Sequence, residues 1–247
     1  MSHWSELWSG IESVETKGNT YMWKMYASLL DGCDFKGKRV LEIGCGTGLN
    51  TIAMGLKGAE ITFLDQSKEA LNLVRNNVRK LGLEAEYIEG DVFECGLAGR
   101  YDIVHSEGLI EHFIGGMRQK IVDAHAEAAR RGGMVTLIAP NMMSVPYRIG
   151  MYAAKKTGTW IYGDEYPYSR EELSRRMEAS GLAVRKTIGG EFVYSLFWLF
   201  CPIWLGSKSI IRKGITLEAN ECLVRLNQGN FFADRWGRII GSTGIRI

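Results

Sequence analysis

The chain has 247 residues, of which 46% are hydrophobic and 23% are charged, so it is long enough to bury a sizeable globular core. Its 30 basic and 28 acidic residues give a formal net charge of +2, which argues against strong attraction to nucleic acid or anionic membranes. The five cysteines are odd in number and lack C-x-x-C spacing, which argues against a disulfide framework and a zinc site. The first residues carry no signal-peptide pattern, so we expect a cytoplasmic protein.

Residues 1–36 predict a helical N-terminal arm rich in aromatic side chains. Arg39–Ile43 then forms an apolar run that ends in glycines, which predicts a buried strand and a turn. Similar runs predict strands at 61–65, 85–91, 101–105 and 134–139, and the segments that start near residues 50, 67 and 117 predict helices. Ser67 is a suitable N-cap for the second of these. Because strands alternate with helices over residues 37–141, we expect parallel β-α-β units in one sheet.

The alternation breaks at residues 142–168, where two prolines and several tyrosines and tryptophans predict a cap inserted between elements of the sheet. Residues 169–247 are expected to complete the fold, with a helix that begins at the capping box of Ser169 and Glu172, a strand at 182–188 and a last strand near 238–241. Within this part, residues 192–207 form an uncharged apolar segment. It is shorter than a membrane-spanning helix, and Pro202 interrupts it.

The strongest functional signal is a glycine-rich turn, Gly44, Gly46 and Gly48, between the first strand and the next helix. Glycines there allow the backbone to approach a ligand closely. Asp65 ends the second strand, 21 residues after Gly44, where a carboxylate can accept hydrogen bonds from ribose hydroxyls. The third strand ends in Asp91 and Val92 at the same edge, where the carboxylate suits the exocyclic amine of an adenine and the valine suits its ring. A tight turn or a capping aspartate explains each feature alone, but all three in register favour a nucleoside-containing cofactor.

These residues, together with Tyr101–His112, resemble the class I S-adenosylmethionine-dependent methyltransferases, and most closely a small-molecule branch that includes ubiquinone-biosynthesis O-methyltransferases. The resemblance covers about residues 37–141. It implies an α/β, Rossmann-like fold, in which a seven-stranded, mostly parallel sheet carries helices on both faces. The arm and the cap insertion are additions to that fold. It also implies S-adenosylmethionine as cofactor and S-adenosylhomocysteine as product.

The resemblance also implies roles for individual residues. Glu42 lies near the methionine amino group, the glycines line methionine and ribose, Asp65 holds the ribose, and Asp91 binds adenine. Tyr21 and Trp23 of the arm are candidates to close over the cofactor, although core packing explains them equally well. The full set of expected cofactor-binding residues is Glu42, Gly44, Gly46, Gly48, Asp65, Gln66, Asp91, Val92, Ser106 and Glu107.

Two other functions compete with this interpretation. A nicotinamide-dependent oxidoreductase also has a glycine-rich turn, but its fingerprint is G-x-G-x-x-G, whereas Gly48 here is followed by Leu49. Glu42 would repel a pyrophosphate and suits a cationic ligand instead. A catalytically inactive, methyltransferase-like binding module is the second alternative, although every expected cofactor position is occupied.

The methyl acceptor is less well defined by the sequence. His112 is the first candidate for a general base, with a structural hydrogen-bonding role at a helix start as its alternative, and His105 is the second; Glu111 and Glu107 are further possibilities. We expect no metal requirement and no nucleic-acid substrate. The aromatic residues of 142–168 and 192–207 favour a small apolar or aromatic acceptor. They are also compatible with core packing, a homodimer interface or peripheral lipid contact through 192–207.

Overall fold

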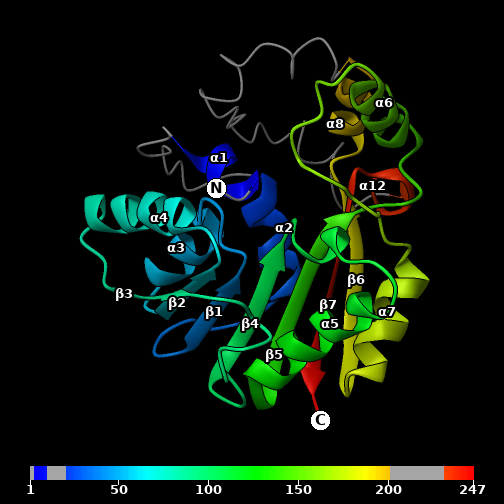
Figure 1. The fold of residues 1–247 in the computed structure, drawn as a ribbon. Helices are drawn as coiled ribbons and strands as arrows, with labels where there is room; N and C mark the ends of the chain where they lie inside the picture. Colours follow the sequence, from blue (N-terminus) through cyan, green and yellow to red (C-terminus); the bar gives the residue numbers. More distant parts are fainter. Residues whose placement is uncertain (1–2, 10–20, 201–230) are drawn as a thin grey trace.

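A computed structural model describes residues 3–9, 21–200 and 231–247 of the chain (Figure 1). The end of the apolar segment, residues 201–207, lies outside the described residues, as do Cys201 and Cys222. Among the residues described, no helix is long and apolar enough to cross a membrane.

The centre of the fold is one seven-stranded sheet with the strand order β3-β2-β1-β4-β5-β7-β6. All neighbouring pairs are parallel except those that involve β7, which runs antiparallel to both β5 and β6. This arrangement confirms the expected Rossmann-like, mostly parallel sheet. The strands are β1 (Arg39–Ile43), β2 (Glu60–Asp65), β3 (Ala85–Glu89), β4 (Tyr101–Glu107), β5 (Ala129–Pro140), β6 (Leu182–Gly190) and β7 (Ile239–Arg246).

Helices cover both faces of the sheet and create two hydrophobic cores (Figure 1). Side chains alternate along a strand, so Val40 packs in one core and Leu41 in the other. The Val40 core is closed by α2 (Tyr21–Leu29), α3 (Leu49–Gly55) and α4 (Lys68–Lys80), and the Leu41 core by α5 (Met117–Ala128) and α7 (Arg170–Ala179). Ser67 and Ser169 cap α4 and α7 with side-chain hydrogen bonds, as predicted.

Short elements lie beyond the carboxyl ends of the strands. Figure 1 shows α6, α8 and α12 grouped beyond the end of β5, with α1 on the opposite side, near α4. The cap is therefore partly helical, because α6 lies within residues 142–168. The bounds are α1 (His3–Trp8), η1 (Ile110–His112), α6 (Val145–Lys156), α8 (Phe192–Phe197), η2 (Trp198–Phe200) and α12 (Phe231–Trp236).

Two strands are longer than the sequence pattern indicates. β5 begins at Ala129 rather than Met134, directly after α5, and its pairing with β4 shifts register between Tyr101 and Ile103. β7 continues to Arg246 although it contains glycines, because it hydrogen-bonds to a strand on each side. One of these glycines has a packing reason: a Cβ at Gly241 would lie 2.7 Å from Leu29 of α2. By contrast, β3 ends at Glu89, which leaves Asp91 in the turn that follows.

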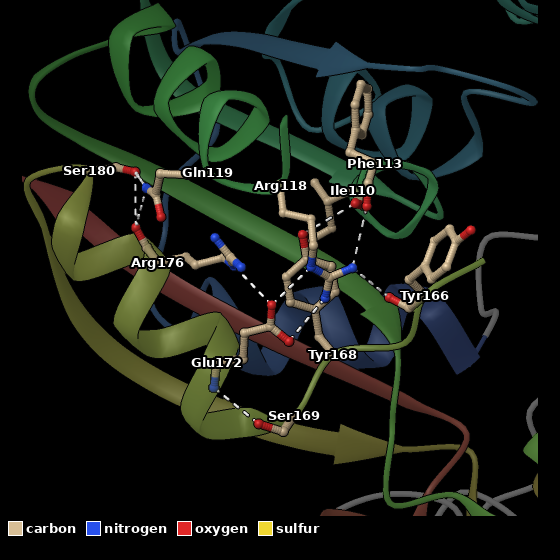
Figure 2. Close-up of polar contacts among 10 residues, drawn as sticks. All are labelled: Ile110, Phe113, Arg118, Gln119, Tyr166, Tyr168, Ser169, Glu172, Arg176 and Ser180. Atoms are coloured by element: carbon tan, nitrogen blue, oxygen red, sulfur yellow. Dashed lines mark hydrogen bonds and ion pairs between the residues drawn. The ribbon is translucent and has the colours of Figure 1, made fainter. Parts of the chain in front are cut away.

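A buried arginine ties this scaffold to the carboxyl edge of the sheet (Figure 2). Arg118 of α5 makes a bidentate ion pair with Glu172 of α7, with N–O distances of 2.9 and 3.0 Å. The same guanidinium donates to the carbonyl of Tyr166 at 2.9 Å and lies over the Tyr168 ring, 3.7 Å from its centroid. Tyr168 in turn donates its hydroxyl to the carbonyl of Ile110 at 3.2 Å. Two helices, the η1 turn and the end of the cap thus share one network.

We expect Arg118→Ala to lower the free energy of unfolding by about 3 kcal/mol, because it leaves buried acceptors without their donor. Arg100→Ala is the matched control, since the Arg100–Glu86 pair is 3.8 Å apart and about half of each side chain is exposed. Arg100→Ala should lower the free energy of unfolding by less than about 1 kcal/mol. Urea denaturation measures both, and equal losses would refute a stabilising role for the Arg118 network.

Candidate functional site

The site lies where β1 and β4 are neighbours at the centre of the sheet. From β1 the chain builds the sheet outward through β2 and β3, whereas from β4 it continues on the other side through β5. In open α/β sheets, ligands bind at such a switch point, outside the carboxyl ends of the strands. Glu42 of β1 lies opposite His105 of β4 in the register, and so the ends of these strands carry the residues of interest.

The turn after β1 depends on its glycines. Gly44, Gly46 and Gly48 have φ angles of 68°, 48° and 66°, a left-handed conformation that other residues rarely adopt. A Cβ at Gly44 would lie 2.9 Å from Leu109, and one at Gly46 would lie 3.1 Å from the Trp8 ring. The turn therefore presents backbone atoms rather than side chains, and Trp8 of α1 packs against Gly46.

Asp65 joins the end of β2 to this turn. One carboxylate oxygen accepts a hydrogen bond from the Ser67 amide at 2.8 Å, and the other accepts one from the Gly46 amide at 3.4 Å. Burial raises the pKa of Asp65. Gln66 follows it and is exposed. Because Gly90 donates its amide to the Asp65 carbonyl at 3.1 Å, the turn that contains Asp91 starts at the same edge.

Asp91 and Val92 lie in the turn after β3 and are both half-buried. The Asp91 carboxylate accepts a hydrogen bond from the amide of Phe93 at 3.0 Å, and Val92 packs against the Leu41 core. The structure thus brings the glycine turn, Asp65 and the Asp91 turn together, as the spacing in the sequence indicates.

Two acidic side chains project from the ends of the central strands. Glu42 is 4% exposed, its Oε2 has no hydrogen-bond partner among the described residues, and burial raises its pKa to about 8. Glu107 ends β4 and accepts a hydrogen bond from Asn50 at 2.9 Å. Burial, and then repulsion by Glu191, raise the pKa of Glu107 to about 7. The two glutamates repel each other, so a cation between them would be stabilised.

His105 and Ser106 lie inside the protein rather than at the crevice. His105 is fully buried, with Nδ1 3.0 Å from the Tyr26 hydroxyl and Nε2 2.7 Å from the Thr51 hydroxyl. Burial lowers its pKa to about 3. The Ser106 hydroxyl lies 2.9 Å from Nε2 of His125, on the other face of the sheet. These contacts favour a structural role for His105, in contrast to the sequence-based expectation of a base.

His112 is half-buried in the η1 turn after β4. Its Nδ1 donates to the Asp164 carbonyl at 2.8 Å, and the Trp4 ring contacts it edge-on, with centroids 4.8 Å apart. Trp4 and Trp8 belong to the aromatic N-terminal arm, and no sequence motif predicts their contacts with His112 and the glycine turn. Trp23 packs instead against Phe35 in the Val40 core, and the Tyr21 side chain lies outside the described residues.

An aromatic cluster lies where the cap meets the apolar segment. It consists of Tyr147, Trp160, Tyr162 and Trp198, and the Tyr147 and Trp198 rings are 5.0 Å apart. Arg238 lies 5.5 Å from the centroid of Trp198 and forms an ion pair with Glu191. Tyr147 donates its hydroxyl to Glu165. No sequence motif marks Glu165, Glu191 or Arg238, because the fold brings them together from distant segments.

Comparison with known proteins agrees with this geometry. A family model described as a methyltransferase domain matches residues 40–133. The ubiquinone biosynthesis O-methyltransferase of Azoarcus sp. (strain BH72) is 28% identical over 160 residues, which are 62% of this chain and 68% of that protein. The enzyme of the same name from Salmonella arizonae is 36% identical over 101 residues, 40% of this chain and 41% of that protein.

Solved structures show the same fold. The magnesium protoporphyrin IX methyltransferase of Synechocystis PCC 6803 with bound S-adenosylhomocysteine has a TM-score of 0.60 at 15% identity, covering 92% of this chain and 82% of that one. A geranyl diphosphate methyltransferase has a TM-score of 0.59 at 14% identity, covering 92% and 77%. With the family match and the curated relatives, this fold places the chain in the class I S-adenosylmethionine-dependent methyltransferases, and its cofactor is S-adenosylmethionine.

Proposed function

We propose that this methyltransferase acts on a small molecule with an aromatic or otherwise apolar body, and that the methyl group is transferred to an oxygen. The observation that carries the proposal is the aromatic cluster of the cap and the apolar segment, which lies beside Glu165, which is buried, and Arg238, which is partly buried. Such a surface binds flat apolar molecules and leaves polar groups to orient them. An oxygen acceptor is favoured because the curated relatives are named O-methyltransferases.

The cofactor half of the site fits the bound molecule in three ways. Gly44 and Gly46 carry no side chain that would hold a cofactor away from the backbone of the turn, which supports close approach of the cofactor there. The Asp65 carboxylate lies at the end of β2 beside the glycine turn, which supports a role in accepting hydrogen bonds from the ribose hydroxyls. The Oε2 atom of Glu42 has no hydrogen-bond partner among the described residues, which supports a role in binding the ammonium group of the methionine part. When bound, S-adenosylmethionine supplies an activated methyl group, so the protein mainly positions the acceptor.

A proton of the acceptor would be removed by His112 of the η1 turn rather than by His105 of β4. Both ring nitrogens of His105 are hydrogen-bonded inside the core. In His112, donation from Nδ1 to the Asp164 carbonyl makes Nε2 the unprotonated nitrogen of the neutral ring. His112 therefore remains our candidate to accept the proton. Lipid contact, homodimer formation and the cytoplasmic location stay predictions.

Calorimetric titration with S-adenosylmethionine, S-adenosylhomocysteine and NAD tests the cofactor site. We expect binding of the two adenosyl compounds and not of NAD. Asp65→Ala should weaken that binding by about 10–100-fold, because hydrogen bonds to a charged group contribute about 1.5–3 kcal/mol. Glu89→Ala is the matched control, since Glu89 pairs with Asp65 in the sheet but is exposed. Equal weakening by both substitutions would contradict the role of Asp65.

Cofactor binding should release protons near neutral pH. Glu42 has a pKa of about 8 in the ligand-free protein and is therefore mainly protonated at pH 7. A bound ammonium group favours the carboxylate and lowers this pKa, so affinity should rise with pH until about pH 8 and then level off. Calorimetry at pH 7 in buffers of different ionisation enthalpy should detect roughly one proton released. Glu42→Gln should abolish most of that release, and unchanged release would rule out Glu42 as its source.

The acceptor proposal is tested with phenols that carry alkyl chains of increasing length, and S-adenosylhomocysteine formation is the readout. We expect product formation to rise with chain length. Trp198→Ala should raise KM about tenfold or more, because a buried aromatic contact contributes about 1.5–3 kcal/mol. Tyr152→Ala, which removes an aromatic side chain of α6 that is 64% exposed, should leave KM unchanged. Turnover of small polar amines alone would refute an apolar oxygen acceptor.

A further inference from the structure

A chain of buried polar side chains leads from the N-terminal arm to the cofactor edge of the sheet. It consists of Tyr26 of α2, His105 of β4 and Thr51 of α3, and all three residues are fully buried. The Tyr26 hydroxyl lies 3.0 Å from Nδ1 of His105, and the Thr51 hydroxyl lies 2.7 Å from Nε2. Apolar side chains would fill the same space without the cost of desolvating polar groups, so this chain is a candidate for a functional role.

The chain ends at Glu42. This residue lies opposite His105 in the register of β1 and β4. Because side chains alternate along a strand, Glu42 faces the same side of the sheet as Val40, and His105 faces the same side as Ile103. Val40 and Ile103 belong to the same core, so Glu42 and His105 are neighbours on one face of the sheet. A hydrogen bond from Thr51 to the Glu42 carboxylate opposes the rise in the pKa of Glu42.

The donors and acceptors of the chain fit together in one direction. Among the described residues, Nδ1 of His105 is the one hydrogen-bond partner of the Tyr26 hydroxyl, so the buried O–H donates to it. Burial lowers the pKa of His105 to about 3, so the ring is neutral and its single proton is on Nε2. Nε2 then donates to the Thr51 oxygen, and this leaves the Thr51 O–H to donate to Glu42.

This direction matters because it ends on the carboxylate expected to meet a cation. A donated O–H favours the charged form of a carboxyl group over the neutral form. The Oε2 atom of Glu42 has no hydrogen-bond partner among the described residues, so Thr51 orients the carboxylate without taking that atom. In the opposite direction, Thr51 would donate to Nε2 of His105, and Glu42 would lose this donor.

The other titratable groups that act on Glu42 work against its charge. Burial is the largest cause of its pKa of about 8, and repulsion by Glu107 of β4 and Asp65 of β2 adds to the rise. Tyr26 of α2 keeps its proton, because burial raises the pKa of its hydroxyl well above the usual value. His105 is neutral. The hydrogen bond from Thr51 therefore opposes burial and both neighbouring carboxylates.

We propose that Thr51 and His105 are positioning residues for S-adenosylmethionine, which act through Glu42 rather than by touching the cofactor. Tyr26 fixes the tautomer of His105, His105 orients the Thr51 hydroxyl, and Thr51 holds the Glu42 carboxylate for the ammonium group of the methionine part. The proposal rests on the role given to Glu42 in the proposed function. It extends that role to α2 and so couples cofactor affinity to the N-terminal arm.

S-adenosylhomocysteine is the probe, because it carries the same ammonium group but no methyl group to transfer. Its dissociation constant is measured by calorimetry at pH 7 and at about pH 9.5, and each variant is compared with the unaltered protein at the same pH, so that ionisation of the probe cancels. Thr51→Val removes the hydroxyl with little change of shape and should make Glu42 harder to ionise. We expect about tenfold weaker binding at pH 7, corresponding to a pKa raised by about one unit. At about pH 9.5 Glu42 is mainly ionised in both proteins, so the ratio should fall toward one.

Three further variants complete the series. Thr51→Ser keeps the hydroxyl and should restore binding at pH 7. Tyr26→Phe should weaken binding in the same pH-dependent way but by a smaller factor, because His105 is then free to adopt either tautomer. Thr62→Val is the matched control, since it removes another buried threonine hydroxyl, which pairs with Glu86 at 3.3 Å. Thr62→Val should leave binding unchanged at both pH values.

The combination with Glu42→Gln separates positioning from a general loss of structure. Thr51→Val should add little to the effect of Glu42→Gln, because both substitutions act on one carboxylate, and a further tenfold loss would overturn the proposal. Weakening by Thr51→Val that is equal at both pH values, or no weakening, would also overturn it. Melting temperatures show whether each variant is folded, and Tyr26→Phe carries the test if Thr51→Val is not.

The same series distinguishes this proposal from the proposed function. Unchanged binding by Glu42→Gln would contradict the role of Glu42 itself, and the chain would fail with it. Weakening by Glu42→Gln without any effect of Thr51→Val or Tyr26→Phe would overturn only the chain and leave the proposed function intact.

Discussion

The burial of acidic side chains at the carboxyl edge of the sheet is the constraint on which the rest of the site depends. Glu42 and Glu107 project from adjacent strands into a poorly solvated space, and each raises the cost of charge on the other. Among the described residues, Asn50 donates a hydrogen bond to the Glu107 carboxylate but carries no charge to neutralise it, and one oxygen of Glu42 has no partner. Such an edge selects positively charged ligands. The ammonium and sulfonium groups of S-adenosylmethionine meet this requirement, whereas the pyrophosphate of NAD does not.

The Arg118 network explains how the fold keeps this edge in shape. A guanidinium that only paired with Glu172 would join two helices on one face of the sheet. Because Arg118 also donates to the carbonyls of Phe113 and Tyr166, it fixes the η1 turn and the end of the cap to the same core (Figure 2). The interaction is thus both a contribution to stability and a means of positioning. Loss of Arg118 would therefore displace the η1 turn and the cap, even though Arg118 itself contacts no expected ligand.

Most of the sheet could be predicted from the sequence, because its parallel strands are short apolar runs between glycines and helix caps. The limits of prediction have identifiable causes. β7 contains two glycines, of which Gly241 allows close packing by α2, and these glycines weaken its strand pattern. The glycine turn and Asp65 could be placed because a parallel sheet puts successive strand ends at one edge. The environment of His105 could not be predicted, because its partners Tyr26 and Thr51 come from two helices on one face of the sheet.

The same reasoning separates the two halves of the site. The cofactor half is built from strand ends and turns within residues 40–133, the part matched by the family model. The proposed acceptor half combines the cap, the apolar segment and Arg238, all of which lie beyond that match. Contacts such as Tyr147 with Trp198 join segments with no fixed spacing, so the family pattern carries no information about them. The cofactor therefore follows from family membership, whereas the proposed acceptor specificity depends on contacts outside the residues that the family model matches.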